Sequence, residues 1–230
     1  GYPAPVHPHG EFTPATKKER GMKKAARLIP SGIRIWHWSH AVAILLLMVS
    51  GMQIRFTEYI SIFPFGFAVK LHRTLGWVLL ADFVLWMIYI IATRSLGRYL
   101  PRWGELRQSG PAQLTYYLLG IFRGDSNPFT LSPENPLNPL QKIIYGLIMG
   151  VCVPLQILTG IILWKGTQSQ RIIDVVETLK TTDAIHVSLF FLLTAFLIGH
   201  LYLGTTGKTP AADFRAMFTG DEPLGKDESL

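Results

Sequence analysis

Four long apolar segments constrain the fold of this chain more than any other feature. They span about residues 33–54, 72–93, 142–164 and 184–204. An α-helix rises 1.5 Å per residue, so about 20 apolar residues cross the roughly 30 Å hydrocarbon core of a bilayer. Charged residues make up only 16% of the chain, against about 25% in an average soluble protein. The sequence therefore predicts an all-α integral membrane protein, a bundle of four transmembrane helices.

The distribution of basic residues predicts how this bundle is oriented. Most of the 22 Lys and Arg residues lie in the N-terminal tail, the 94–142 stretch and the C-terminal tail. Because cytoplasmic segments next to membrane spans are enriched in Lys and Arg, we expect both termini and the 94–138 loop in the cytoplasm. The chain would then be a multi-pass protein of the cell's inner membrane. Basic residues in these positions interact with the lipid bilayer, so the net charge of +7 does not indicate nucleic-acid binding.

The chain divides into three parts on this interpretation. Residues 1–30 form a basic tail without the pattern of a cleavable signal peptide, residues 31–205 the four-helix domain, and residues 206–230 a C-terminal tail. The segment 165–183 has helical spacing of apolar residues and is expected to lie on the membrane surface. Cys152 is the single cysteine, which excludes an iron–sulfur cluster and a c-type haem attached through two cysteines of this chain.

Five of the seven histidines lie near the ends of the predicted spans. His186 and His200 share the fourth span and are 14 residues apart. Fourteen residues make nearly four helical turns, so the two side chains share a face and lie about 21 Å apart along the axis. Ionisable side chains inside a bilayer are costly and usually functional. This face therefore indicates two functional positions, one at each depth of the membrane.

Matching depths give each of these histidines a partner. His72, near the outer start of the second span, matches His186, and His37, near the inner start of the first span, matches His200. Two imidazoles on facing helices suit six-coordinate haem iron, and helix bundles build cofactor sites in this way. We therefore predict two b-type haems with these four histidines as iron ligands. Zinc would need three or four ligands in one place, and a single histidine could also be a hydrogen-bonded core residue.

Other polar residues near the spans have more than one interpretation. His40 lies one turn after His37 and could replace it as ligand, bind a haem propionate or serve a quinone. Arg34 suits a propionate of the inner haem, and Arg73, with Lys70 and Arg55, either a propionate of the outer haem or solvent. Asp82, in the middle of the second span, should be protonated, paired or facing a cavity.

Glycines and one proline inside the spans predict local features of packing. Gly51, Gly76, Gly150 and Gly160 would let either a neighbouring helix or a haem macrocycle approach closely. Pro154 lacks the backbone N–H that a helix interior uses, so we expect a kink in the third span.

Several motifs together resemble a known family. They are Arg34-Ile-Trp-His37-Trp, His72-Arg73-Thr-Leu-Gly76, the His186/His200 pair and Gly199-His200-Leu-Tyr-Leu-Gly204. They are similar to the cytochrome b (gamma) subunits of respiratory formate dehydrogenases, membrane nickel–iron hydrogenases and thiosulfate-reductase-type complexes, over about residues 31–220. The resemblance implies a di-haem membrane anchor whose ligands fall on His37, His72, His186 and His200. It also implies an outer-face (periplasmic) partner with iron–sulfur clusters or several haems.

The resemblance also implies a quinone site near the inner haem. Asn138-Pro-Leu-Gln141-Lys142 matches the pattern that opens the third span beside the quinone, menaquinone or ubiquinone, in the formate dehydrogenase branch. Taken alone, Asn138 could equally be an interfacial residue in a proline-rich turn.

The predicted function is therefore electron transfer between an outer-face redox subunit and the quinone pool, within a respiratory complex that could form higher oligomers. The chemistry of the primary substrate would take place on another subunit. One alternative is a stand-alone cytochrome b that oxidises quinol and feeds a soluble acceptor, and another is a haem-free anchor or transporter.

Overall fold

The structure, a computed structural model, describes residues 29–129, 137–166, 172–206, 209 and 211–220. These residues form helices joined by turns, with no strand among them. Four helical segments are long and apolar enough to cross a membrane: Ser31–Arg55, Phe65–Ala92, Pro139–Gly166 and Glu177–Gly204. The prediction of an all-α membrane bundle with four spans is confirmed.

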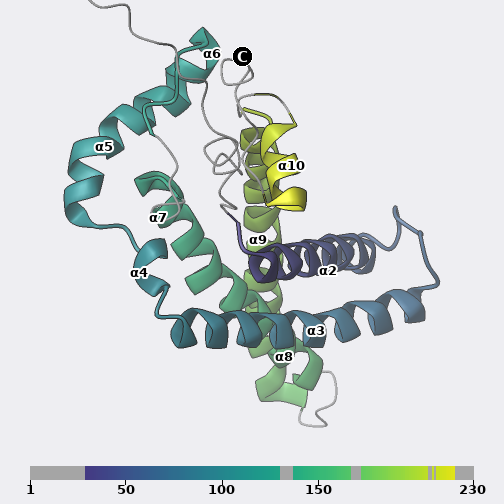
Figure 1. The fold of residues 1–230 in the computed structure, drawn as a ribbon. Helices are drawn as coiled ribbons and strands as arrows, with labels where there is room; N and C mark the ends of the chain where they lie inside the picture. Colours follow the sequence, from purple (N-terminus) through teal and green to yellow (C-terminus); the bar gives the residue numbers. More distant parts are fainter. Residues whose placement is uncertain (1–28, 130–136, 167–171, 207–208, 210, 221–230) are drawn as a thin grey trace, which may run out of the picture.

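Figure 1 labels the α-helices from which the spans are built. The first two are α2 (Ser31–Arg55) and α3 (Phe65–Ala92). The third combines α7 (Pro139–Leu147), a π-helical turn η2 (Ile148–Cys152) and α8 (Val153–Gly166). The fourth is the end of α9 (Ile172–Gly204). The π-helical turn directly precedes the Val153-Pro154 step, where the missing N–H of proline interrupts the regular hydrogen bonding of the helix.

The second and fourth spans begin seven residues earlier than the sequence indicated, at Phe65 and Glu177. Helix α3 starts at Phe65 because Pro64 precedes it and its carbonyl accepts the N–H groups of Phe67 and Ala68, at 2.9 and 3.0 Å. His72 therefore lies about two turns inside the helix. Residues 172–183 of the expected surface segment continue directly into the fourth span as part of α9. The rest of that segment includes residues 167–171, which lie outside the described residues.

The 94–138 loop is largely helical where the structure describes it. It contains α4 (Leu96–Tyr99), α5 (Trp103–Thr115), a π-helical turn η1 (Tyr116–Gly120) and α6 (Ile121–Arg123). Figure 1 shows α5 beside α7, away from the connection between α2 and α3. The Lys142 ammonium lies 2.8 Å from a carboxylate oxygen of Glu105 and is 2% exposed. This ion pair joins the loop to the start of the third span.

The C-terminal tail contributes a helix that the sequence analysis did not anticipate. Helix α10 (Ala212–Thr219) docks on the start of α2 through its last turn. The Arg34 guanidinium bonds the Phe218 carbonyl oxygen, and Trp38 Nε1 donates to the Met217 carbonyl oxygen at 3.1 Å. The Trp38 ring also stacks on Phe218 with ring centres 4.3 Å apart. A cation at the C-terminal end of a helix is favourable because the helix dipole is negative there.

The bundle consists of two helix pairs. Helix α2 packs along α3, and α8 packs along α9, while α3 and α8 join the pairs. A buried core of Ile148, Cys152 and Val153 fills this junction. The Gln53 side chain, 1% exposed, holds the turn between α2 and α3: its Nε2 donates to the Phe63 carbonyl at 2.5 Å, and its Oε1 accepts the Phe63 N–H at 3.0 Å. Large apolar side chains cover the outer faces of the spans, as a lipid-facing surface requires.

We predict that Glu105→Ala lowers the free energy of unfolding of the detergent-solubilised protein by about 3 kcal/mol, because it leaves the buried Lys142 ammonium without a partner. The double variant Glu105→Ala/Lys142→Met should recover most of this loss, since both charges are then removed. Melting followed by circular dichroism measures both effects. Glu177→Ala is the control, because its ion pair with Lys180 is exposed. Equal melting of the single and double variants would contradict the structural role of the pair.

Candidate functional site

The structure brings four of the predicted histidines together as two pairs. The ring centres of His37 on α2 and His200 on α9 are 6.2 Å apart. The ring centres of His72 on α3 and His186 on α9 are 6.4 Å apart. All four side chains are half-buried. We call these the inner pair and the outer pair, after the membrane sides that the basic residues predict.

The separation within each pair fits one metal ion between two imidazoles. A bond from an imidazole nitrogen to a first-row metal such as zinc is about 2 Å long, and the nitrogen lies about 1 Å from the ring centre, so two rings on opposite sides of one ion have centres about 6 Å apart. No group of three or more His, Cys, Asp or Glu residues that could hold a metal occurs in the described part of the chain. Two ligands at each position suit haem, whose macrocycle supplies the remaining bonds to iron.

Hydrogen bonds orient the outer pair. His72 Nδ1 lies 3.0 Å from the Ser50 hydroxyl, and His186 Nδ1 lies 2.8 Å from the Thr159 hydroxyl. The Gln156 amide nitrogen is 3.2 Å from His186 Nε2. A metal at this position would require the flexible Gln156 side chain to turn aside, whereas both Nδ1 contacts could remain.

The inner pair has fewer hydrogen bonds. His200 Nδ1 lies 2.9 Å from the Tyr145 hydroxyl. His37 Nδ1 is buried and has no hydrogen-bond partner among the described residues. The ring of Phe196 stacks on His200 with centres 5.7 Å apart. Orphaned ring nitrogens are uncommon in protein interiors, and a pair with spare nitrogens at metal-binding separation fits a haem site. The residues of both pairs therefore suit the cofactor, and their role as ligands stays a prediction.

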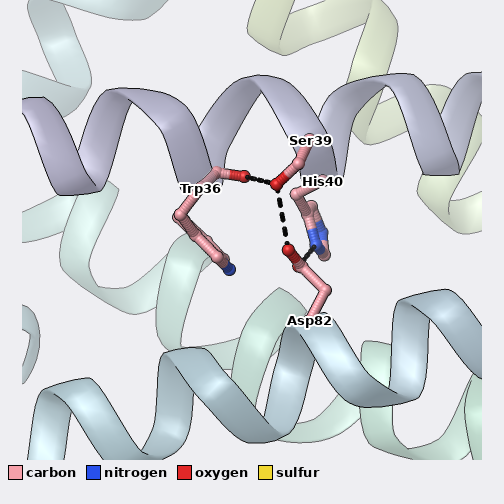
Figure 2. A network of polar contacts seen from close by, with 4 residues as sticks. All are labelled: Trp36, Ser39, His40 and Asp82. Carbon is pink, nitrogen blue, oxygen red and sulfur yellow. Dashed lines mark hydrogen bonds and ion pairs between the residues drawn. The ribbon is translucent and has the colours of Figure 1, made fainter.

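His40 contacts α3 rather than either pair. Its Nδ1 lies 2.8 Å from Asp82 Oδ2. Figure 2 shows Ser39 and His40 of α2 pointing toward this carboxyl group. The Ser39 hydroxyl lies 3.1 Å from Asp82 Oδ1 and 2.8 Å from the Trp36 carbonyl oxygen. Asp82 is therefore paired, one of the situations expected for a carboxyl group within a span. Of the two candidate ligands on α2, His37 is the one that faces His200.

The arginines expected at propionates have different surroundings. Arg34 bonds Phe218 and also donates to the Ser31 hydroxyl at 3.1 Å, while its Nε is buried with no partner among the described residues. Arg55, the last residue of α2, faces Asp183 of α9 at 3.8 Å. Arg73, beside His72, is exposed.

Asn138 and Gln141 cap helix α7. The side-chain Oδ1 of Asn138 accepts the Gln141 backbone N–H at 2.9 Å, and Gln141 Oε1 accepts the Asn138 backbone N–H at 3.0 Å, which is a capping box. Asn138 Nδ2 donates to the Tyr117 hydroxyl at 2.6 Å. Burial raises the pKa of Tyr117, so this hydroxyl keeps its proton at physiological pH. The motif thus has a structural role at the start of α7, and Tyr145, one turn after Gln141 on the same helix, contacts His200.

Sequence reasoning missed the residues that bond the histidine rings. Ser50, Tyr145, Gln156 and Thr159 lie in apolar segments and carry no motif of their own. The one sequence signal near them is glycine. Gly51 directly follows Ser50 and lies against His72, and Gly160 directly follows Thr159 and lies against His186. Gly76 and Gly150, expected to act in the same way, have open space around them.

The comparison with protein families agrees with this geometry. The sequence model of the family described as "Prokaryotic cytochrome b561" matches residues 28–220. The chain belongs to the prokaryotic cytochrome b561 family. It is therefore a multi-pass membrane electron-transfer protein of the cytochrome b type, and membership implies binding of b-type haem.

Curated relatives of this cytochrome b561 chain include two bacterial proteins. It is 32% identical over 216 residues to "Putative cytochrome YdhU" of Escherichia coli (strain K12), covering 90% of this chain and 80% of that protein. It is 22% identical over 191 residues to "Putative protein-methionine-sulfoxide reductase subunit YedZ1" of Azospira oryzae, covering 78% of this chain and 90% of that protein. No solved structure matches it significantly.

The same substitution at each of the two histidines on α2 tests which of them is the haem ligand. We predict that His37→Gln halves the haem content of the purified protein, because it removes one side of the inner pair. His40→Gln should keep the full content, since an amide can still donate to Asp82. A pyridine haemochrome assay per mole of protein measures both. Loss of haem in His40→Gln with full content in His37→Gln would assign the ligand to His40 instead.

Proposed function

We propose that this chain is the membrane-anchor cytochrome b subunit of a respiratory oxidoreductase complex in the inner membrane. It carries electrons through two b haems between a redox subunit at the outer face and the quinone pool. The observation that carries this proposal is the presence of two histidine pairs of metal-binding separation at two depths of one bundle.

The chain's own residues hold, orient and insulate the electron carriers. Haem supplies the one-electron chemistry, and the protein supplies ligation and surroundings. His186 and His200 lie on one straight helical face about 21 Å apart along α9, so two haems held there would span much of the hydrocarbon core. Helices α2 and α3 provide the opposite ligands, and the apolar side chains of the bundle exclude water from the path.

The positions of the termini support the proposed orientation. Helix α10 contacts the start of α2, so the two described ends of the chain lie on one side. The basic 94–138 loop follows the two spans α2 and α3 along the chain, so it would return to that same side. The outer face then presents the turn at residues 56–64 and the region of Asp183 and Arg55 to a partner. The relative from Azospira oryzae is named as a subunit of a reductase, which supports a partner protein rather than a stand-alone cytochrome.

The quinone site is proposed at the start of the third span. Gln141 uses its Oε1 in the capping box, and no described residue bonds its Nε2. This donor lies one turn from Tyr145, whose hydroxyl contacts His200 of the inner pair. A quinone carbonyl that accepts a hydrogen bond from Gln141 would be close to the inner haem. Electron entry from outside with proton uptake inside would separate charge across the membrane.

We predict that Gln141→Glu raises the apparent KM for a quinol about two- to tenfold, because it removes one hydrogen-bond donor worth about 0.5–1.5 kcal/mol. Glutamate at this position of a capping box preserves the helix start. Haem content and melting temperature should therefore stay unchanged. Stopped-flow reduction of the haems by a soluble menaquinol or ubiquinol analogue measures the effect. An unchanged KM would show that Gln141 does not bind the quinone.

Affinity purification of the native complex in mild detergent distinguishes the anchor from the stand-alone cytochrome. The proposal predicts a stoichiometric iron–sulfur or multihaem protein bound to the chain. The charge-reversal variant Asp183→Lys at the outer face should weaken this association, whereas Asp125→Lys in the cytoplasmic loop should not. Recovery of the fully haem-loaded chain alone, able to pass electrons from quinol to a soluble acceptor, would favour the alternative.

A further inference from the structure

The two histidines of the outer pair are held in the same way by two unrelated helices. Ser50-Gly51 on α2 faces His72, and Thr159-Gly160 on α8 faces His186. In each case a hydroxyl residue contacts the ring Nδ1, and the glycine that follows lies against the ring Cε1. We call each of these dipeptides an imidazole cradle.

The hydroxyl of each cradle determines which ring nitrogen carries the proton. Ser50 Oγ also lies 2.7 Å from the Leu46 carbonyl oxygen, and Thr159 Oγ1 lies 2.8 Å from the Leu155 carbonyl oxygen. A carbonyl cannot donate, and a hydroxyl has one hydrogen. For both contacts to be hydrogen bonds, the hydroxyl donates to the carbonyl and accepts Nδ1–H from histidine. The unprotonated Nε2 of each ring is then the nitrogen available to iron.

The glycines set how closely each ring can approach. A Cβ atom at Gly51 would lie 2.9 Å from His72 Cε1, and one at Gly160 would lie 3.4 Å from His186 Cε1. The first distance is a clash, and the second is a close van der Waals contact. Both cradle hydroxyls are buried, with Ser50 at 0% and Thr159 at 6% exposure. Hydroxyl and glycine therefore fix the position of the ring from two sides without solvent.

The inner pair has no such cradle. His200 Nδ1 contacts the phenol of Tyr145, and His37 Nδ1 has no partner among the described residues. Neither Gly146 nor Gly199, each next to one of these contacts in sequence, has any atom within 4 Å of the position of a Cβ. The two metal positions thus differ in how many imidazole N–H groups have acceptors.

We propose that Ser50 and Thr159 are positioning residues that lower the reduction potential of the outer haem below that of the inner haem. This inference rests on the proposed function, in that it requires one haem at each pair. A ligating imidazole that donates its second N–H becomes more basic. A more basic ligand stabilises the oxidised iron, and hydrogen bonding around axial ligands is one of the protein's means of setting haem potentials. Electrons that enter at the outer face then move to higher potential at the inner, quinone-side haem.

Redox titration of the purified protein tests the effect of Ser50 and Thr159 on the potential of the outer haem. Thr159→Val and Ser50→Ala should each raise the midpoint potential of the outer haem, and the double variant should raise it further. Thr159→Ser should keep the midpoint potential of the unaltered protein, because serine retains the hydroxyl that accepts the His186 N–H. Thr194→Val is the matched control, since the Thr194 hydroxyl makes the same bond to the carbonyl four residues earlier but contacts no histidine. The His37→Gln background isolates the outer haem for the measurement.

The outcomes separate the two proposals. Fewer than two haems in the unaltered protein would overturn the proposed function itself. Two haems with an outer potential unchanged in both cradle variants, or shifted equally by Thr194→Val, would overturn the cradle inference alone. Loss of the outer haem in Thr159→Val with recovery in Thr159→Ser would support the positioning role of the hydroxyl, and the potential measured in Ser50→Ala would then decide its effect on the outer haem.

The glycines provide a second measurement. Gly51→Ala should shift the low-spin electron paramagnetic resonance signal of the outer haem or abolish it, because the new methyl group displaces the His72 ring. Gly66→Ala on the same side of the bundle is the control, since nothing lies within 4 Å of a Cβ there. Alanine favours helix over glycine, so general destabilisation does not explain a change. Identical spectra for the two variants would contradict a ring held by Gly51.

Discussion

The cost of placing imidazoles inside a bilayer is the constraint on which the rest of this structure depends. A polar ring within a hydrocarbon core is costly unless its nitrogens are hydrogen-bonded or bind a metal. Helix α9 carries His186 and His200 on one face at two depths, and the chain meets this cost with facing histidines and with hydroxyl groups. The positions of α2, α3 and α8 follow from this requirement, because each contributes a ring or an acceptor.

The remaining elements stabilise this arrangement from the two ends of the bundle. At the inner end, α10 docks on α2 through Trp38, and the ion pair of the buried Lys142 with Glu105 ties the loop to the third span. At the outer end, the Gln53 side chain closes the turn between α2 and α3. The His40–Asp82 pair joins α2 to α3 between these ends. Polar contacts thus join the spans at several depths, while lipid-facing side chains stay apolar.

The spans and the histidine pairing were predictable because hydropathy and helical periodicity are local properties of the sequence. Depth alone placed His37 near His200 and His72 near His186. Contacts between residues far apart in sequence were not predictable. Ser50 and Thr159 resemble any hydroxyl residue in an apolar helix, and nothing in the sequence around Arg34 indicated its contact with α10. The early start of α3 depended on Pro64, which reads equally well as part of a loop. The ligand roles, the haem number and the quinone site remain predictions.

The most direct test of the central claim is a haem count on the purified, unaltered protein by pyridine haemochrome assay, together with a dithionite-reduced difference spectrum. The account predicts two b-type haems per chain, one for each histidine pair. One haem would mean that one of the two pairs does not bind iron. A protein without haem, folded and membrane-extracted intact, would contradict the account.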